Sequence, residues 1–189
     1  PYWNVPRSIA VKEMMPQVRS DPDFFARHGY EVIYTGGGQD IVIDPRTVDW
    51  NLWNPENMPF RFRQPPGNAN ALGRVKFMFP NRFAVYLHDT NDRSLFDRAA
   101  RTLSSGCVRI EQPFVLADLL MEGDPSWSHA RLEAILASGR ATRVDLPKPM
   151  PVLLTYYTAW VEDGEVLFRE DIYDRDVAVL EALDGPFRG

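Results

Sequence analysis

One histidine and the chain's single cysteine lie in segments suited to nucleophilic chemistry. His88 lies at the end of a predicted strand, within the segment YLHDT (86–90), and Cys107 lies within SSGCVR (104–109). A thiol attacks an acyl carbon as the thiolate, and a nearby imidazole can take its proton. The pair therefore indicates acyl chemistry by a cysteine nucleophile with a histidine base.

The residues next to this pair suit the same chemistry. Gly106 allows the backbone to approach a substrate closely, and in a tight turn its N–H and that of Cys107 can both point at a developing oxyanion. An imidazole base must be held in one tautomer by a third group. The carbonyl or the side chain of Asp89 is the nearest candidate for that group.

A purely structural interpretation stays open at this point. A lone cysteine is most often a small buried side chain, and a lone histidine at a strand end is most often structural. The glycine and the hydroxyl residues before Cys107 make the segment too polar for a core strand. Spacing alone leaves the two interpretations about equal.

Composition excludes several classes of protein. The chain has 189 residues, is 44% hydrophobic and 25% charged, and carries a formal net charge of −5. This predicts one domain, or one domain with a small insertion, and excludes a disordered chain. No run approaches about 18 apolar residues, so no membrane span is expected. The acidic balance argues against nucleic acid, and one cysteine with three histidines lacks the spacing of a zinc site, so we expect no metal or cofactor.

The periodicity of apolar residues predicts the elements that must position the pair. Val11, Met14, Met15 and Val18 form one stripe of a helix. The predicted helices cover 8–20, 24–29, 113–122, 126–138 and 174–183. The predicted strands cover 30–34, 41–43, 60–64, 75–79, 83–87, 108–110, 143–146, 152–160 and 165–169. The expected fold class is α+β, a mostly antiparallel or mixed sheet system with helices at its edges.

The spacing of the chemical residues resembles the signature of YkuD-type L,D-transpeptidases. His88 is followed by 15 residues and then by Ser-Ser-Gly-Cys-x-Arg, whereas the family motif usually reads [ST]-H-G-C-x-[NR]. Residues 60–121 resemble most closely the large Gram-negative branch typified by YcbB. This resemblance implies a mostly β sheet or sandwich catalytic core with peripheral helices and an inserted capping subdomain.

The resemblance assigns a role to each residue of the motif. It implies that Cys107 is the nucleophile, that His88 is the general base, and that the Gly106 and Cys107 amides form the oxyanion hole. It implies that Asp89 orients His88 through its backbone carbonyl. Arg109 is expected to shape the site or to bind a substrate carboxylate.

One residue departs from the family pattern. Ser105 stands where the common motif has a second histidine, which leaves His88 as the base because His28 and His129 lie in predicted helices. We interpret Ser105 as a hydrogen-bonding residue of the turn and, with Tyr86, as part of the substrate-binding surface.

The resemblance also implies a reaction. The donor and the acceptor are tetrapeptide stems of peptidoglycan. The cysteine attacks the carbonyl before the terminal D-Ala and forms a thioester, and a side-chain amine of a second stem completes a 3→3 crosslink. Carbapenems are the expected inhibitors, and the periplasm or cell envelope is the expected location, although residues 1–6 show no signal peptide.

The resemblance predicts three parts of the chain. Residues 1–7 are the truncated start of the catalytic domain, 8–59 are a lid that is more mobile than 60–121, and 60–189 are the catalytic core. Trp50 and Trp53 are candidates to line the lid.

Two alternatives stay open. The first is a Cys–His peptidase or amidase, such as an L,D-carboxypeptidase, which uses water as the acceptor. The second is a non-catalytic wall-binding module. The sequence carries no prediction of oligomeric state.

Overall fold

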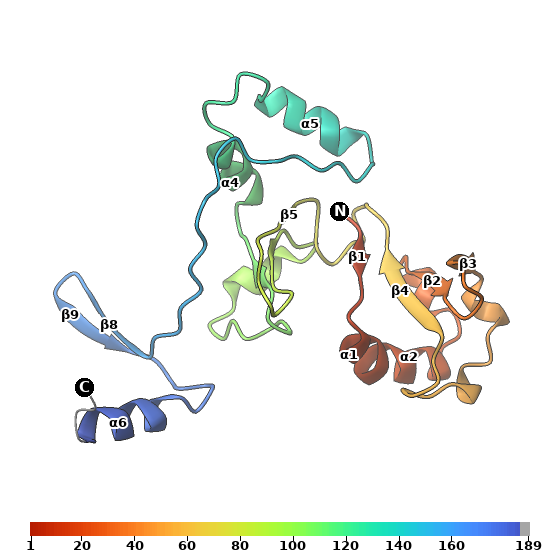
Figure 1. Ribbon diagram of the computed structural model, residues 1–189, viewed down its shortest axis with the longest axis horizontal. Helices are drawn as coiled ribbons and strands as arrows, with labels where there is room; N and C mark the ends of the chain where they lie inside the picture. The colour runs from red at the N-terminus through yellow and green to blue at the C-terminus, as the bar shows by residue number, and fades with distance from the viewer. Residues whose placement is uncertain (186–189) are drawn as a thin grey trace. The chain divides into compact units, whose positions relative to one another are not determined.

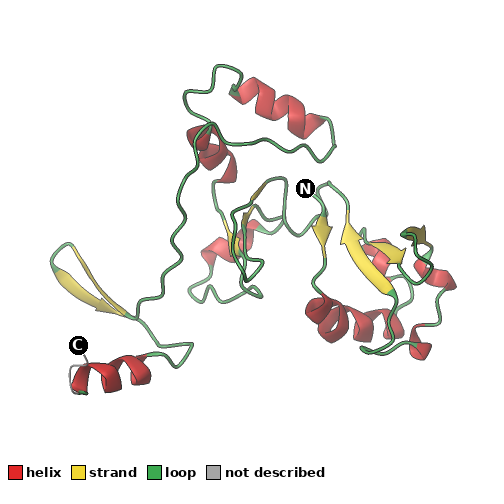
Figure 2. Cartoon of the chain, viewed as in Figure 1, coloured by secondary structure: helices red, strands yellow, loops and turns green. Residues whose placement is uncertain are grey.

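The computed structural model describes residues 1–185 of the chain. It divides into two compact units, Pro1–Met150 and Pro151–Gly189, which are drawn in Figure 1 and coloured by secondary structure in Figure 2. Within the described range no helix combines the length and apolar character that a membrane span requires.

The first unit begins with a four-stranded antiparallel sheet in the order β1-β4-β2-β3. Its strands are β1 (Trp3–Asn4), β2 (Glu31–Tyr34), β3 (Ile41–Ile43) and β4 (Phe60–Gln64). The short helical segments before and between them are α1 (Arg7–Ile9), the π-helical turn η1 (Ala10–Met14), α2 (Met15–Ser20), α3 (Phe24–Arg27), and the 3₁₀ turns η2 (Pro45–Thr47) and η3 (Trp50–Leu52).

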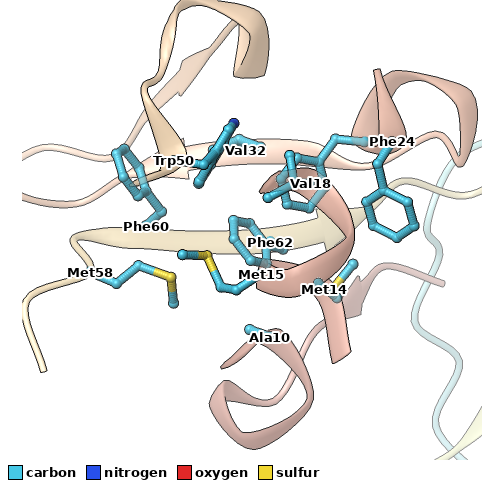
Figure 3. Packing of buried hydrophobic residues seen from close by; sticks show 11 residues of the cluster. Ala10, Met14, Met15, Val18, Phe24, Val32, Trp50, Met58, Phe60 and Phe62 are labelled. Atoms are coloured by element: carbon cyan, nitrogen blue, oxygen red, sulfur yellow. The ribbon is translucent and has the colours of Figure 1, made fainter. Parts of the chain in front are cut away.

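The hydrophobic core of this part lies between β4 and the helices. Alternation along β4 buries Phe60 and Phe62 while Arg61 is exposed, as period 2 requires. Phe62 lies 4.4 Å from Phe25 between ring centroids, and Trp50 completes the aromatic group (Figure 3). The predicted helical stripe is confirmed, because Met14, Met15 and Val18 are buried in the same cluster and Val11 packs against it.

A second, three-stranded sheet follows in the first unit. Its strands are β5 (Lys76–Phe77), β6 (Leu87–His88) and β7 (Val108–Arg109), with β5 antiparallel and β7 parallel to β6. The connection between the parallel strands contains the 3₁₀ helix η4 (Arg93–Asp97). The helices α4 (Pro113–Leu120) and α5 (His129–Ala137) confirm two predicted helices.

The second unit contains a hairpin and a helix. The strands β8 (Ala159–Glu162) and β9 (Glu165–Phe168) pair through a turn in which Asp163 and Gly164 both have positive φ. Such a turn matches the twist of a two-residue hairpin. The helix α6 (Asp176–Asp184) confirms the last predicted helix.

Some of the predicted strands are wrong in part or in whole. Residues 143–146 and 152–158 form no strand, since no neighbouring segment pairs with them. The strand predicted at 83–87 is reduced to β6. Asn81 accepts from the Val85 N–H at 3.0 Å and donates to the Val85 carbonyl at 2.7 Å, which folds 81–85 into a turn with Ala84 at φ 53°.

The structure is α+β, with three small sheets in the described residues. The predicted boundary at residue 60 falls inside a packed sheet, since β4 pairs with both β1 and β2 and carries Phe60 and Phe62 into the core. The lid role of residues 8–59 stays a prediction.

Candidate active site

The strands β6 and β7 bring the motif residues to one face of the second sheet. Leu87 pairs with Val108 and His88 with Arg109. The pairing extends backward, because the Val108 N–H donates to the Tyr86 carbonyl at 3.1 Å. Side chains at every second position share a face. The same register sets Cys107 opposite Tyr86. Cys107 therefore lies on the same face as His88, two residues away along the strand direction.

A row of three side chains crosses this face. Lys76 on β5 pairs with His88, which pairs with Arg109 on β7. The Lys76 Nζ atom lies 4.1 Å from the centroid of the Tyr86 ring. Sequence reasoning missed Lys76, because a lysine in a strand shows nothing of its partner until the register is known.

His88 is held as a neutral base. It is 4% exposed, and its Nδ1 hydrogen-bonds to the Asp89 carbonyl oxygen, which requires Nδ1–H and leaves Nε2 to accept a proton. Burial is the largest cause that lowers the pKa of His88. The hydrogen bond to Asp89 acts in the opposite direction, and the charges of Arg109 and Lys76 add to the lowering. The imidazole is thus uncharged at neutral pH.

Cys107 is half-buried and lies beside Tyr86. Burial, followed by the charge of the Cys107 thiolate and a hydrogen bond with it, raises the pKa of Tyr86 to about 12. The phenol therefore keeps its proton and can donate it to the sulfur. Lys76 is also close enough to Cys107 for the thiolate to favour its charged form, although burial is the larger effect and lowers the pKa of Lys76.

The turn before Cys107 is closed by a serine. The Ser104 hydroxyl donates to the Cys107 carbonyl at 2.7 Å and accepts the Gly106 N–H at 3.2 Å. Gly106 has φ +123°, a conformation that favours glycine. Within residues 1–185 the Cys107 N–H contacts no protein acceptor, whereas the Gly106 N–H is engaged by Ser104. The amide free to meet an oxyanion is that of Cys107.

The remaining predicted site residues differ in their surroundings. Arg109 Nη1 donates to the Leu103 carbonyl at 2.9 Å, while its buried Nε has no protein acceptor. Ser105 is exposed. His28 hydrogen-bonds to the Phe24 carbonyl within its own helix. No group of three or more His, Cys, Asp or Glu side chains in the described chain is arranged to hold a metal ion.

His129 is engaged elsewhere as well. Its Nδ1 lies 2.7 Å from an Asp118 carboxylate oxygen, a contact that joins α5 to α4. Neither this histidine nor His28 belongs to the face that carries Cys107.

Comparison with known proteins adds a family to this geometry. Residues 1–127 match the YkuD family model, which describes an L,D-transpeptidase catalytic domain. The chain is also 38% identical over 183 residues to a Haemophilus influenzae protein named "Putative L,D-transpeptidase". The match covers 96% of this chain and 36% of that relative, so the chain spans about a third of the relative's length.

Proposed function

The chain belongs to the YkuD family of L,D-transpeptidase catalytic domains, and we propose that it forms 3→3 crosslinks in peptidoglycan through a thioester on Cys107. The donor is a tetrapeptide stem that ends in D-Ala. The acceptor is the side-chain amine of the diamino acid at the third position of another stem.

The placement of Cys107 and His88 is the observation that carries this proposal. The two residues share one face of neighbouring parallel strands, and His88 Nδ1 is already engaged by Asp89. An acyl transfer needs a nucleophile beside a base whose tautomer is fixed. The shared face of the two strands and the hydrogen bond from His88 Nδ1 to the Asp89 carbonyl support this assignment.

In the first half of the reaction the donor acylates the enzyme. His88 Nε2 takes the proton of the Cys107 thiol, and the thiolate attacks the carbonyl between the third residue and D-Ala. The negative charge that develops on the carbonyl oxygen is stabilised by the Cys107 N–H, and by the Gly106 N–H once it leaves Ser104. The C–N bond then breaks, His88 gives its proton to the leaving amine, and D-Ala departs.

In the second half the acceptor resolves the thioester. The amine of the second stem attacks the thioester carbonyl and gives a proton to His88. The C–S bond breaks, the sulfur leaves as the thiolate, and the proton on His88 restores the thiol. Tyr86, through its hydroxyl near the sulfur, and Arg109, through its unsatisfied Nε, are the proposed contacts for the stems.

The location is proposed from the substrate, and the subfamily is proposed from the resemblance of residues 60–121 to one branch of the family. We place the activity in the periplasm or cell envelope, where peptidoglycan is assembled, within the YcbB-like branch. Residues 8–59 are proposed to cover the stems as a lid.

The proposal is tested with purified chain and a tetrapeptide stem. Mass spectrometry should detect free D-Ala and a crosslinked dimer. Cys107→Ala and His88→Ala should each lower both products by about a thousandfold or more, since the two residues act as one unit. Ser105→Ala should stay within a few-fold of the parent.

Three outcomes would redirect the proposal. Release of D-Ala with tripeptide but no dimer favours the carboxypeptidase. Binding to peptidoglycan without any release favours the wall-binding module. Full activity of His88→Ala, with unchanged circular dichroism, would mean that another base operates.

A strained lactam should trap the same intermediate. Opening a carbapenem ring uses the thiolate and the oxyanion site as the stem does, and ring strain supplies the driving force. Intact-mass measurement should show one carbapenem per chain, and none on Cys107→Ala. A folded parent chain that stays unmodified in excess carbapenem would contradict the thioester.

A further inference from the structure

The Asp89 carboxylate is a buried charge that the proposed reaction does not use. Its carbonyl faces His88, but its side chain is only 4% exposed and points elsewhere. A buried carboxylate is costly unless it is paired and hydrogen-bonded. We therefore identify the groups that pair with the Asp89 carboxylate and donate hydrogen bonds to it.

The first partner is the backbone at the entrance to β5. The Arg74 N–H donates to Asp89 Oδ2 at 2.8 Å, and the Asp89 N–H donates to the Val75 carbonyl at 2.9 Å. Gly73 allows this approach, because it has φ +60° and a Cβ there would overlap the carboxylate. Asp89 is thus fixed through both its backbone and its side chain.

The second partner is a guanidinium from the connection between the parallel strands. Arg93 Nη2 donates to Asp89 Oδ1 at 2.8 Å, and Arg93 Nη1 donates to the carbonyl of Glu111. Arg93 is the first residue of η4, and the N-terminus of η4 is capped by Asp92. One side chain therefore joins the residue after β6 to a residue just beyond β7.

These contacts on the Asp89 side chain also restrict the position of the Asp89 carbonyl, which accepts the hydrogen bond from His88. The Ile110 N–H donates to the His88 carbonyl at 2.8 Å, so β6 and β7 are already joined at this end. Arg93 adds an ionic contact at the side chain of Asp89. With the carboxylate held at two oxygens, the Asp89 carbonyl is kept against His88 Nδ1.

We propose that Arg93 is a positioning residue, which through Asp89 keeps His88 in the Nδ1–H form that leaves Nε2 facing Cys107. The catalytic role given to His88 rests on the proposed function. The position and the tautomer of the His88 imidazole do not depend on the proposed function, so they can be measured separately from activity.

A structural salt bridge would behave differently. Arg93 is 48% exposed but Asp89 is buried, so loss of a merely structural pair should lower the free energy of unfolding, while the remaining Arg74 N–H bond keeps Asp89 in place and the imidazole unaltered. A residue that holds a base in place should instead alter the imidazole and the turnover together.

The direct test is ¹⁵N NMR of the histidine side chains. The chain has three histidines, so His88 is assigned by comparison with His88→Ala. The parent should show the Nδ1–H tautomer. Arg93→Met should give a mixture of tautomers at His88, with the signals of His28 and His129 unchanged. Arg93→Lys should restore part of the parent signal, because an ammonium reaches one of the two acceptors.

Turnover supplies the second readout. Arg93→Met should lower kcat for D-Ala release by roughly tenfold to a hundredfold with KM within about twofold, since misplacing a base costs this much. Arg98→Met, an exposed arginine just after η4, is the matched control and should match the parent in both measurements.

Each outcome bears on the proposal. An unchanged His88 signal in Arg93→Met overturns it, whether or not kcat falls. A changed signal with unchanged kcat also overturns it. If the parent releases no D-Ala, the proposed function fails, and the tautomer measurement still decides the role of Arg93. If Arg93→Met does not fold, Arg93→Lys carries the same comparison.

Discussion

At the scale of single residues, the proposed chemistry depends on an imidazole that is kept uncharged. His88 is buried and lies between two cations, Lys76 and Arg109, in register across three strands. Asp89 is the carboxylate that acts on it within residues 1–185, and the Tyr86 ring lies 5.8 Å from the imidazole between centroids. Burial, with help from the two cations, lowers the pKa of His88 below the 6.5 of an ordinary histidine.

This arrangement predicts the acid limb of the pH profile. Because the pKa of His88 is lowered, the base form persists to lower pH, and the midpoint of the acid limb for D-Ala release should lie below pH 6.5. Lys76→Met removes one of the cations that disfavour protonated His88. The midpoint of the acid limb should therefore move to higher pH, measured as kcat/KM against pH.

Two variants control that measurement. Lys76→Arg keeps the charge and should keep the midpoint near that of the parent. Lys148→Met removes an exposed lysine elsewhere and should have no effect. A midpoint for Lys76→Met at or below the parent value would show that Lys76 does not act on His88.

The site could be predicted in part from residue types. Cys107, His88 and Asp89 are identified by the chemistry of a thiol, a base and an orienting group, and the structure places them on or next to β6 and β7. Lys76 and Arg93 were not found. The partner of Lys76 depends on the strand register, and the partners of Arg93 depend on a side chain that crosses the connection between β6 and β7. Neither feature can be predicted from the spacing of residues along the sequence.

At the scale of elements, β4 is the strand on which the first sheet depends. It pairs with β1 and β2 and carries Phe62, which is 1% exposed against Phe25 and Trp50. Phe62→Ala should lower the free energy of unfolding by about 3–5 kcal/mol in urea. Phe168→Ala on β9, where the side chain is 75% exposed, should change it by less than about 0.5 kcal/mol.

Equal effects of these two substitutions would contradict the packing described here. A large loss for Phe62→Ala alone would show that β4, the start of the predicted catalytic core, is stabilised by helices that the sequence assigns to the lid.

Elements were predictable where their own residues determine them. The stripe of η1 and α2, the alternation in β4, and the Asp-Gly turn of the last hairpin each follow from local periodicity or turn chemistry. Residues 143–146 alternate in the same way and form no strand, because a strand also needs a partner. Side-chain bonds from Asn81 likewise override the strand propensity of 83–85.

At the scale of the whole molecule, the two units differ in their cores. The buried apolar side chains of the described chain all lie between Ala10 and Leu132, and none belongs to β8, β9 or α6. An isolated two-stranded hairpin is marginal in water. The amides of Trp160 and Leu167, which are a hydrogen-bonded pair of this hairpin, should therefore exchange with deuterium much faster than those of Val32 and Ile33 on β2.

Residue-resolved hydrogen exchange measures both sets in one experiment. Equal protection of Trp160 and Val32 would show that the second unit has stabilising contacts of its own. Slow exchange throughout β2 would also count against residues 8–59 as an independently mobile lid, and would limit any such motion to segments such as Gly36–Gly38.

The parallel pairing of β6 and β7 also determines when the thiol of Cys107 gains its proposed base. His88 and Cys107 meet only after residues 89–107 have closed into a loop, and closing a loop is an entropic cost that a folding chain meets late. A newly made or unfolded chain therefore carries an ordinary cysteine with no base beside it. The thiol and its proposed base therefore lie on one sheet only in the folded chain, and loss of the β6–β7 pairing separates them.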